Sequence, residues 1–72
     1  MRSHEITAEL VATIGSVAVG VGDRVEPADT LVILESMKME IPVLAESSGV
    51  VAEIAVNEGD VVQEGDLIAR VE

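Results

Sequence analysis

The sequence predicts an all-β domain, a flattened antiparallel barrel or sandwich made of two small sheets. Valine and isoleucine account for 19 of the 72 residues, and β-branched side chains fit a pleated sheet better than a helix. Apolar and polar residues alternate in places with the period of two that is typical of strands. The dipeptide Gly22-Asp23 recurs as Gly59-Asp60, an offset of 37 residues, which indicates two similar half-domains.

The first half predicts a long strand, a very short strand around Val25 and a second long strand, in that order. Short clusters of glycine, proline, serine and aspartate divide the chain at spacings too close for helices. We expect the aspartates of the Gly-Asp turns to accept hydrogen bonds from turn amides. The turn clusters are Gly20 to Asp23, Pro27 to Asp29, Ser47 to Gly49, Gly59 to Asp60 and Gly65 to Asp66.

The second half repeats this order, so residues 19–35 lie over residues 56–72. Neither half can cover its own apolar face. Packing the two halves against each other would bury both apolar faces and leave few free strand edges. In "VVAEIAVNEGD" the alternation of apolar and polar residues places Glu53 and Asn57 on the solvent-exposed face of the strand. The predicted inward residues are Val50, Ala52, Ile54 and Val56, and their counterparts Thr13, Gly15, Val17 and Val19.

Residues 32–43, "VILESMKMEIPV", predict the hairpin that joins the two halves and has no internal counterpart. With Met37 and Lys38 as the central residues, apolar pairs fall on one face, as a core requires. Pro42 cannot donate to a ladder, which places this side of the hairpin at an edge or a bulge. The predicted pairs are Ser36 with Met39, Glu35 with Glu40, Leu34 with Ile41 and Val32 with Val43.

The hairpin tip breaks local rules, and that pattern is typical of functional sites. Two-residue hairpins favour positive φ at both central residues. Glycine and asparagine adopt positive φ with little strain, whereas methionine and lysine do not. Glu35 opposite Glu40 is a mildly unfavourable pair of like charges. Lys38 is the sole lysine of the chain. An exposed lysine at a tip is ordinarily only a solvated charge, but methionine on both sides suits an adaptable binding surface.

Composition excludes several classes of function. A formal net charge of −10 repels nucleic acid, and the chain lacks the aromatic residues that stack on bases. Missing aromatic anchors also favour a monomer with transient partner contacts. The chain has no cysteine, and the single histidine, His4, lies in an N-terminal segment expected to be frayed, so we expect no metal site.

The chain is also expected to be cytoplasmic and away from membranes. The N-terminal residues carry charges and lack the apolar core of a signal peptide. The longest uncharged stretch, Leu10 to Gly22, is too short to cross a bilayer. Seventy-two residues allow one domain with a small core.

The motif "ESMKMEIPV" resembles the biotin-attachment motif of biotin carboxyl carrier domains, in the biotinyl/lipoyl attachment family. The resemblance extends from about Val11 to Val71 and includes the Gly-Asp turns and the repeat. It implies that family's eight-stranded flattened barrel, a barrel-sandwich hybrid of two four-stranded sheets, as one domain over residues 1–72. The chain looks like the small free-standing biotinylated carriers rather than a long multidomain carboxylase.

The resemblance implies the site and its chemistry. Lys38 would be acylated with biotin by a biotin protein ligase, and Met37 and Met39 would present it to that ligase. A separate biotin carboxylase and a carboxyltransferase would then use the biotin to move a carboxyl group, and the carrier would contribute no catalytic residue. The sequence shows no Ser/His/Asp or Cys/His arrangement of the kind that nucleophilic enzymes use, which agrees with this expectation. The flanks of the motif are Glu35, Ser36 and Glu40.

The chain departs from the family pattern at three positions. Alanine is common in the family where Ser36 stands, which is a small-for-small change. Glycine is usual at the positions of Ala12 and Ala28, as it is at Gly49 and Gly65 in the second half. If those backbones need positive φ, alanine adds strain.

Two alternatives stay open. A lipoyl carrier would share the fold and the lysine, but lipoyl motifs more often have Asp-Lys-Ala where this chain has Met37, Lys38 and Met39, which favours biotin. An unmodified barrel that serves as an interaction module is the other alternative. The two differ from the biotin carrier in the modification that they predict at Lys38.

Overall fold

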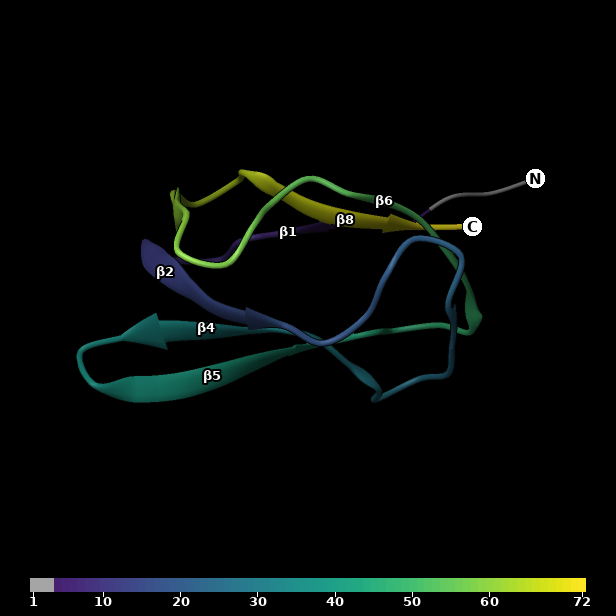
Figure 1. The fold of residues 1–72 in the computed structure, drawn as a ribbon, viewed down its shortest axis with the longest axis horizontal. Coiled ribbons are helices and arrows are strands. Elements are labelled where there is room, and N and C mark those ends of the chain that lie inside the picture. Colours follow the sequence, from purple (N-terminus) through teal and green to yellow (C-terminus); the bar gives the residue numbers. More distant parts are fainter. Residues whose placement is uncertain (1–3) are drawn as a thin grey trace.

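The computed structural model describes residues 4–72, and over these residues it contains eight strands and no helix. The strands form two antiparallel sheets, ordered β1-β8-β6-β3 and β5-β4-β2-β7. The sheets lie one over the other as a flattened sandwich that is not a closed barrel (Figure 1). This confirms the predicted fold class. The strands are β1 (His4–Thr7), β2 (Ala12–Val17), β3 (Arg24–Val25), β4 (Thr30–Ser36), β5 (Met39–Leu44), β6 (Gly49–Ile54), β7 (Val61–Val62) and β8 (Leu67–Val71).

The repeat found in the sequence extends to the hydrogen bonds. β2 and β3 recur 37 residues later as β6 and β7. The Ile14 amide donates to the Asp60 carbonyl at 2.7 Å, and at the equivalent position the Val51 amide donates to the Asp23 carbonyl at 2.8 Å. Each half thus fixes a strand of its own to a turn of the other half. The two halves are held by reciprocal bonds around a pseudo-twofold axis.

The Gly-Asp turns are closed by their aspartates, as predicted. The Asp23 carboxylate accepts a hydrogen bond from the Gly20 amide at 2.8 Å, and Asp60 accepts one from the Asn57 amide at 2.8 Å. The same arrangement closes the turns at Asp29 and Asp66, which accept from amides three residues earlier at 2.8 Å. All four turns use one motif, in which a side chain satisfies an amide that the ladder leaves free.

The predicted inward faces of β2 and β6 are wrong in their first halves. The structure buries Ile14 and Val51, each 1% exposed, whereas Val50 is 41% exposed. A bulge between Ile14 and Ser16 and another between Val51 and Glu53 shift the register at equivalent points. An extra residue in a strand reverses the side-chain alternation beyond it. The predicted phase therefore holds only past the bulges, where Val17 and Ile54 pack against the core.

The N-terminal segment is a strand in the structure, so the expectation that it is frayed at His4 is wrong. β1 pairs antiparallel with β8, with His4 opposite Val71 and Ile6 opposite Ala69. Ile6 packs against both core clusters. Residues 1–3 of the predicted domain 1–72 lie outside the described residues.

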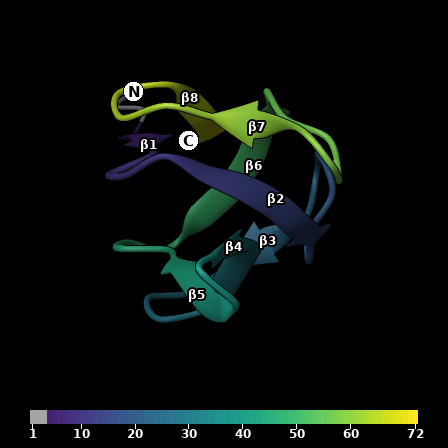
Figure 2. The same ribbon diagram turned by 90° about the vertical axis from the view of Figure 1, so that its left-hand side faces the viewer.

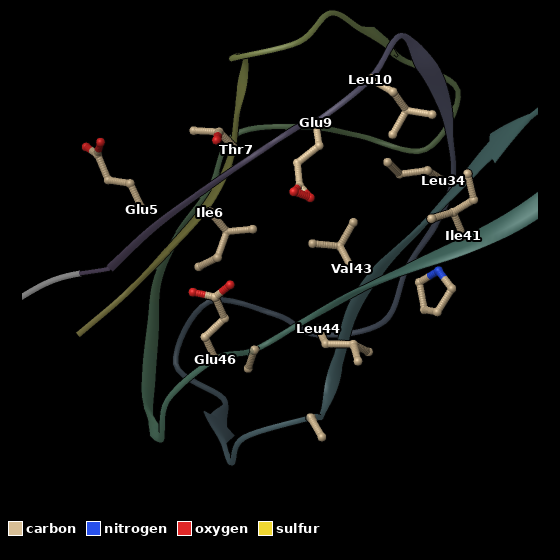
Figure 3. A pocket seen from close by; sticks show the side chains of 13 residues that line it. Glu5, Ile6, Thr7, Glu9, Leu10, Leu34, Ile41, Val43, Leu44 and Glu46 are labelled. Atoms are coloured by element: carbon tan, nitrogen blue, oxygen red, sulfur yellow. The ribbon is translucent and has the colours of Figure 1, made fainter.

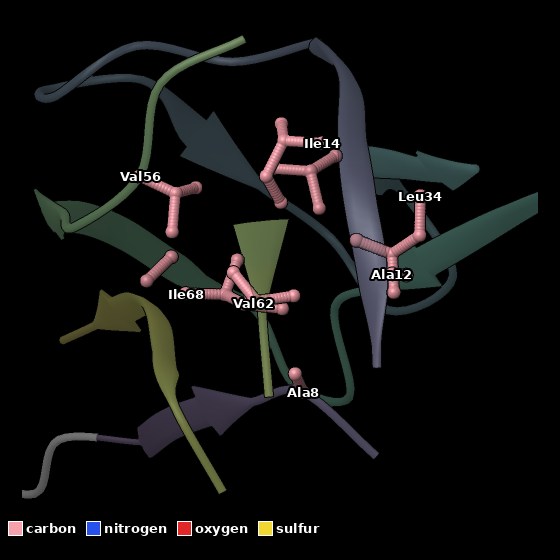
Figure 4. Packing of buried hydrophobic residues seen from close by; sticks show 9 residues of the cluster. Ala8, Ala12, Ile14, Leu34, Val56, Val62 and Ile68 are labelled. Atoms are coloured by element: carbon pink, nitrogen blue, oxygen red, sulfur yellow. The ribbon is translucent and has the colours of Figure 1, made fainter. Parts of the chain in front are cut away.

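The core fills the space between the two sheets (Figure 4). Side chains of Ile14 and Leu34 from one sheet meet Ile68 from the other, and all three are at most 1% exposed. Full burial of one such side chain contributes about 1.5–3 kcal/mol. Every buried residue of the described chain is alanine, valine, leucine or isoleucine. The interior of residues 4–72 therefore holds no polar side chain that would require a partner.

Ala28 and Ala12 differ in their backbone conformation. Ala28 has φ of 76°, and its counterpart Gly65 has φ of 92°, so the expected strain at Ala28 is confirmed. Ala12 is not among the residues with positive φ, and neither is Gly49. A Cβ atom at Gly49 would lie 2.5 Å from the Glu72 carbonyl oxygen. The second half needs glycine there because another backbone passes close to it.

Exchanging alanine and glycine at the matched turns tests this strain. A Cβ atom at Gly65 would meet nothing within 4 Å, so Gly65→Ala should lower the free energy of unfolding by about 1 kcal/mol through its backbone alone. Ala28→Gly should not lower stability and should raise it by up to about 1 kcal/mol. Urea denaturation of both variants measures these changes. A loss of stability in Ala28→Gly would contradict the strain.

Candidate functional site

The hairpin of β4 and β5 projects from one end of the molecule, opposite the end where the C-terminus lies (Figure 1). Figure 2 views the molecule from the hairpin end, with β5 in front. β5 is an edge strand, which agrees with the prediction from Pro42. The register is the predicted one, in which Ser36 faces Met39, Glu35 faces Glu40, Leu34 faces Ile41 and Val32 faces Val43.

The turn at the tip has left-handed backbone at both central residues. Met37 has φ of 53° and Lys38 has φ of 64°, as expected for the mirror-image turn that joins two twisted strands. Holding L-residues there costs roughly 1–2 kcal/mol each. Burial of Val32 and Leu34, each 1% exposed, contributes about 1.5–3 kcal/mol per side chain and offsets that cost. The core end of the hairpin therefore holds the strained tip.

Lys38 lies exposed at this tip. The other cations of residues 4–72 form ion pairs with carboxylates, whereas Lys38 forms none within 4 Å in this part of the chain. Arg24 contacts Glu26 at 3.1 Å, and Arg70 contacts Glu53 at 3.5 Å. A hydrogen bond with Glu72 raises the pKa of Arg70 above its ordinary value. The ε-amine of Lys38 is thus available to a reagent in solution.

Two exposed methionines flank the lysine. The side chain of Met37 is 91% exposed and that of Met39 is 59% exposed. Neither belongs to a core cluster. Flexible, polarisable methionine side chains beside a single amine suit an adaptable binding surface.

The acidic flanks of the motif point to different surroundings. Glu35 and Glu40 are exposed and lie opposite each other across the hairpin, and Ser36 is half-buried. A Cβ atom on Gly15 would lie 2.8 Å from Cγ of Glu35, so the Glu35 side chain lies across the backbone of β2. Glycine at 15 makes room for it. The structure therefore brings the six predicted residues together at one tip, with Glu35 directed toward β2.

A separate groove of about 630 Å³ lies between β1 and β5, which are edge strands of different sheets (Figure 3). Ile6, Ile41 and Val43 form apolar parts of its wall, and the carboxylates of Glu9 and Glu46 lie beside it. Residues 35–40 are not among those that line it. The groove is where the sandwich stays open, and it is distinct from the lysine tip.

Residues 4–72 contain no group of three or more histidine, cysteine, aspartate or glutamate side chains placed to hold a metal ion. The described part of the chain contains no helix that is long and apolar enough to cross a bilayer.

Comparison with known proteins identifies the family. The family model described as "Biotin-requiring enzyme", for biotin/lipoyl domains, matches residues 3–71. The chain belongs to the biotin/lipoyl domain family. This confirms the resemblance found in the attachment motif.

Relatives of this family match both the sequence and the fold. The chain is 52% identical over 67 residues to the "Biotinylated protein TB7.3 homolog" of Mycobacterium leprae, covering 93% of this chain and 94% of that protein. It is 43% identical over 63 residues to the "Biotin/lipoyl attachment protein" of Bacillus subtilis, covering 88% and 86%. The structure of Kluyveromyces lactis urea carboxylase matches all of this chain with a TM-score of 0.93 and 35% identity, and the match spans 6% of that carboxylase.

Sequence reasoning missed the strand β1, the two bulges and the contact between Gly15 and Glu35. The sequence held a signal for one of them. Gly15 is the one glycine inside β2, and an isolated glycine in a strand often marks a bulge or a close approach. The groove had no such signal, because it depends on how two edge strands from distant segments are placed.

Replacing Met37 with a residue that favours left-handed backbone should stabilise the hairpin. We expect Met37→Asn to raise the free energy of unfolding by about 0.5–1 kcal/mol, because the exposed methionine has no packing to lose. Thermal or urea unfolding checks this, with Met39→Asn as the matched control in the strand, where asparagine is unfavourable. Equal effects in the two variants would contradict the turn strain.

Proposed function

We propose that this chain is a biotin carboxyl carrier protein in which Lys38 carries biotin as an amide. The observation that supports this most is the sole lysine, exposed between two exposed methionines and free of ion pairs within residues 4–72. The similarity to a protein named as biotinylated supports the same cofactor. In this proposal residues 1–72 act as one biotinyl domain.

The tip suits amide formation with a carboxylic acid. Once its ammonium has lost a proton, Nζ of Lys38 attacks the activated carboxyl carbon of biotin on a biotin protein ligase. A C–N bond forms, the bond from that carbon to the activating group breaks, and the nitrogen loses a second proton to solvent. The lysine loses its positive charge, so the chain goes from −10 to −11. Met37 and Met39 contact the ligase, and Glu35, Ser36 and Glu40 frame the lysine as flanks of the motif.

The chain contributes position rather than catalysis. When attached, biotin supplies a ring nitrogen that accepts a carboxyl group, and the lysine stem lets the cofactor reach two separate enzymes. In this proposal those enzymes are a biotin carboxylase and a carboxyltransferase, and the likeness to part of a urea carboxylase supports partners of the carboxylase class. The acidic surface and the absence of aromatic residues suit transient contacts by a monomer in the cytoplasm.

Substitution of the lysine tests the cofactor and its position. The full chain, incubated with a biotin protein ligase, ATP and biotin, should gain the mass of one biotinyl group, and Lys38→Arg should gain none. The melting temperature should not change, because the replaced side chain is exposed and makes no ion pair in the described chain. Parallel incubation with a lipoate ligase separates the two carriers. Acylation by lipoate alone would favour the lipoyl carrier, and no modification by either ligase would favour an interaction module.

Replacement of Met39 should separate recognition from folding. Met39→Ala removes an exposed apolar side chain at the tip, so we expect slower biotin transfer, by roughly tenfold if the ligase loses about 1.4 kcal/mol of contact. Stability should change by less than about 0.5 kcal/mol. Transfer rates and thermal unfolding measure the two effects. A large fall in melting temperature would contradict the assignment of this residue to recognition.

A further inference from the structure

Easily oxidised atoms are concentrated at one place on this chain. The sequence has no cysteine, tryptophan or tyrosine and has three methionines. Met1 lies outside the described residues, and Met37 and Met39 stand on both sides of Lys38 with exposed fractions of 91% and 59%. The buried residues are all aliphatic. Among residues 4–72, thioether sulfur therefore occurs only beside the lysine, and it is accessible to solvent.

We propose that Met37 and Met39 form a reversible oxidation site that controls acylation of Lys38 under peroxide. This inference rests on the proposed function, because it concerns loading of the same lysine. Its chemical class is methionine sulfoxide formation by hydrogen peroxide, which methionine sulfoxide reductases reverse.

The oxidation step balances with peroxide as the only co-reactant. A lone pair of the thioether sulfur attacks one peroxide oxygen, the O–O bond breaks, and an S–O bond forms. The second oxygen takes up both hydrogens and leaves as water. Sulfur is oxidised by two electrons and peroxide is reduced by two.

Oxidation should change recognition and leave the fold intact. A sulfoxide converts a flexible apolar side chain into a polar one, and a ligase surface that receives Met37 or Met39 would have to desolvate the new oxygen. Neither side chain packs in the core clusters, so the sandwich loses no buried contact. The same modification in a buried methionine would instead disrupt packing.

The two sulfurs should react in a definite order. Susceptibility to oxidation follows exposure, and Met37 is the more exposed of the two. We therefore expect Met37 to become sulfoxide before Met39 as peroxide is added. Peptide mapping by mass spectrometry follows each site.

The decisive experiment compares oxidised and untreated full-length chain before biotin is attached. Hydrogen peroxide should add one and then two oxygen atoms at residues 37 and 39, and the rate of biotin transfer should fall between about tenfold and a hundredfold. The melting temperature should stay the same. Methionine sulfoxide reductases should restore the rate.

The matched control is the double variant Met37→Leu, Met39→Leu, which retains Met1. Its transfer rate, whatever its starting value, should not respond to peroxide. Equal transfer rates for untreated chain and chain oxidised at both sulfurs would overturn the inference, as would an equal loss of rate in the double variant. Failure of untreated chain to accept biotin would instead overturn the proposed function.

Discussion

The fold depends on the reciprocal backbone bonds that tie each half-repeat to a turn of the other half. Ile14 donates to the Asp60 carbonyl and Val51 donates to the Asp23 carbonyl. These bonds place the second half over the apolar face of the first, so that both faces are buried in one core. A chain of 72 residues without cysteine has no disulfide to do this. Ordered turns matter as much as the core, since the aspartates that close them present the carbonyls on which the bonds depend.

The hairpin tip has no counterpart in the internal repeat. Its backbone strain is tolerated because the base of the hairpin packs in the core. Val32 and Leu34 anchor one strand inside the sandwich, while Ile41 and Val43 pack against the core from the other. Two left-handed residues at the tip are thus held by contacts several residues away. Glycine there would relax the backbone but would remove a methionine or the lysine. The chain keeps chemically useful side chains where conformation alone would favour small ones.

The sequence predicted most of the tip and less of the strands that lead to it. The hairpin register followed from one requirement, that Leu34 and Ile41 share a face, and the structure has that register. The repeat was visible because turn chemistry tolerates few residues, so Gly-Asp recurs in both halves. The alternation of apolar and polar residues predicted the wrong inward faces at the start of β2 and β6. Each strand has a bulge, at Gly15 and at Ala52, and the bulge reverses which side chains face inward. β1 escaped notice because four residues with two charged or titratable side chains carry little strand signal, and only pairing with β8 orders them.

The division between an inert interior and a reactive tip follows from these constraints. The core contains only aliphatic side chains, which cannot titrate, bind metals or oxidise readily. The Lys38 amine and the sulfur atoms of Met37 and Met39 lie outside the core, and the methionine side chains do not belong to either core cluster. A modification of Lys38, Met37 or Met39 can therefore change the charge and polarity of the tip without changing the free energy of unfolding of the sandwich. A fold of this size has a small free energy of unfolding, so a site that had to share its contacts with the core would lose either stability or the freedom to be modified.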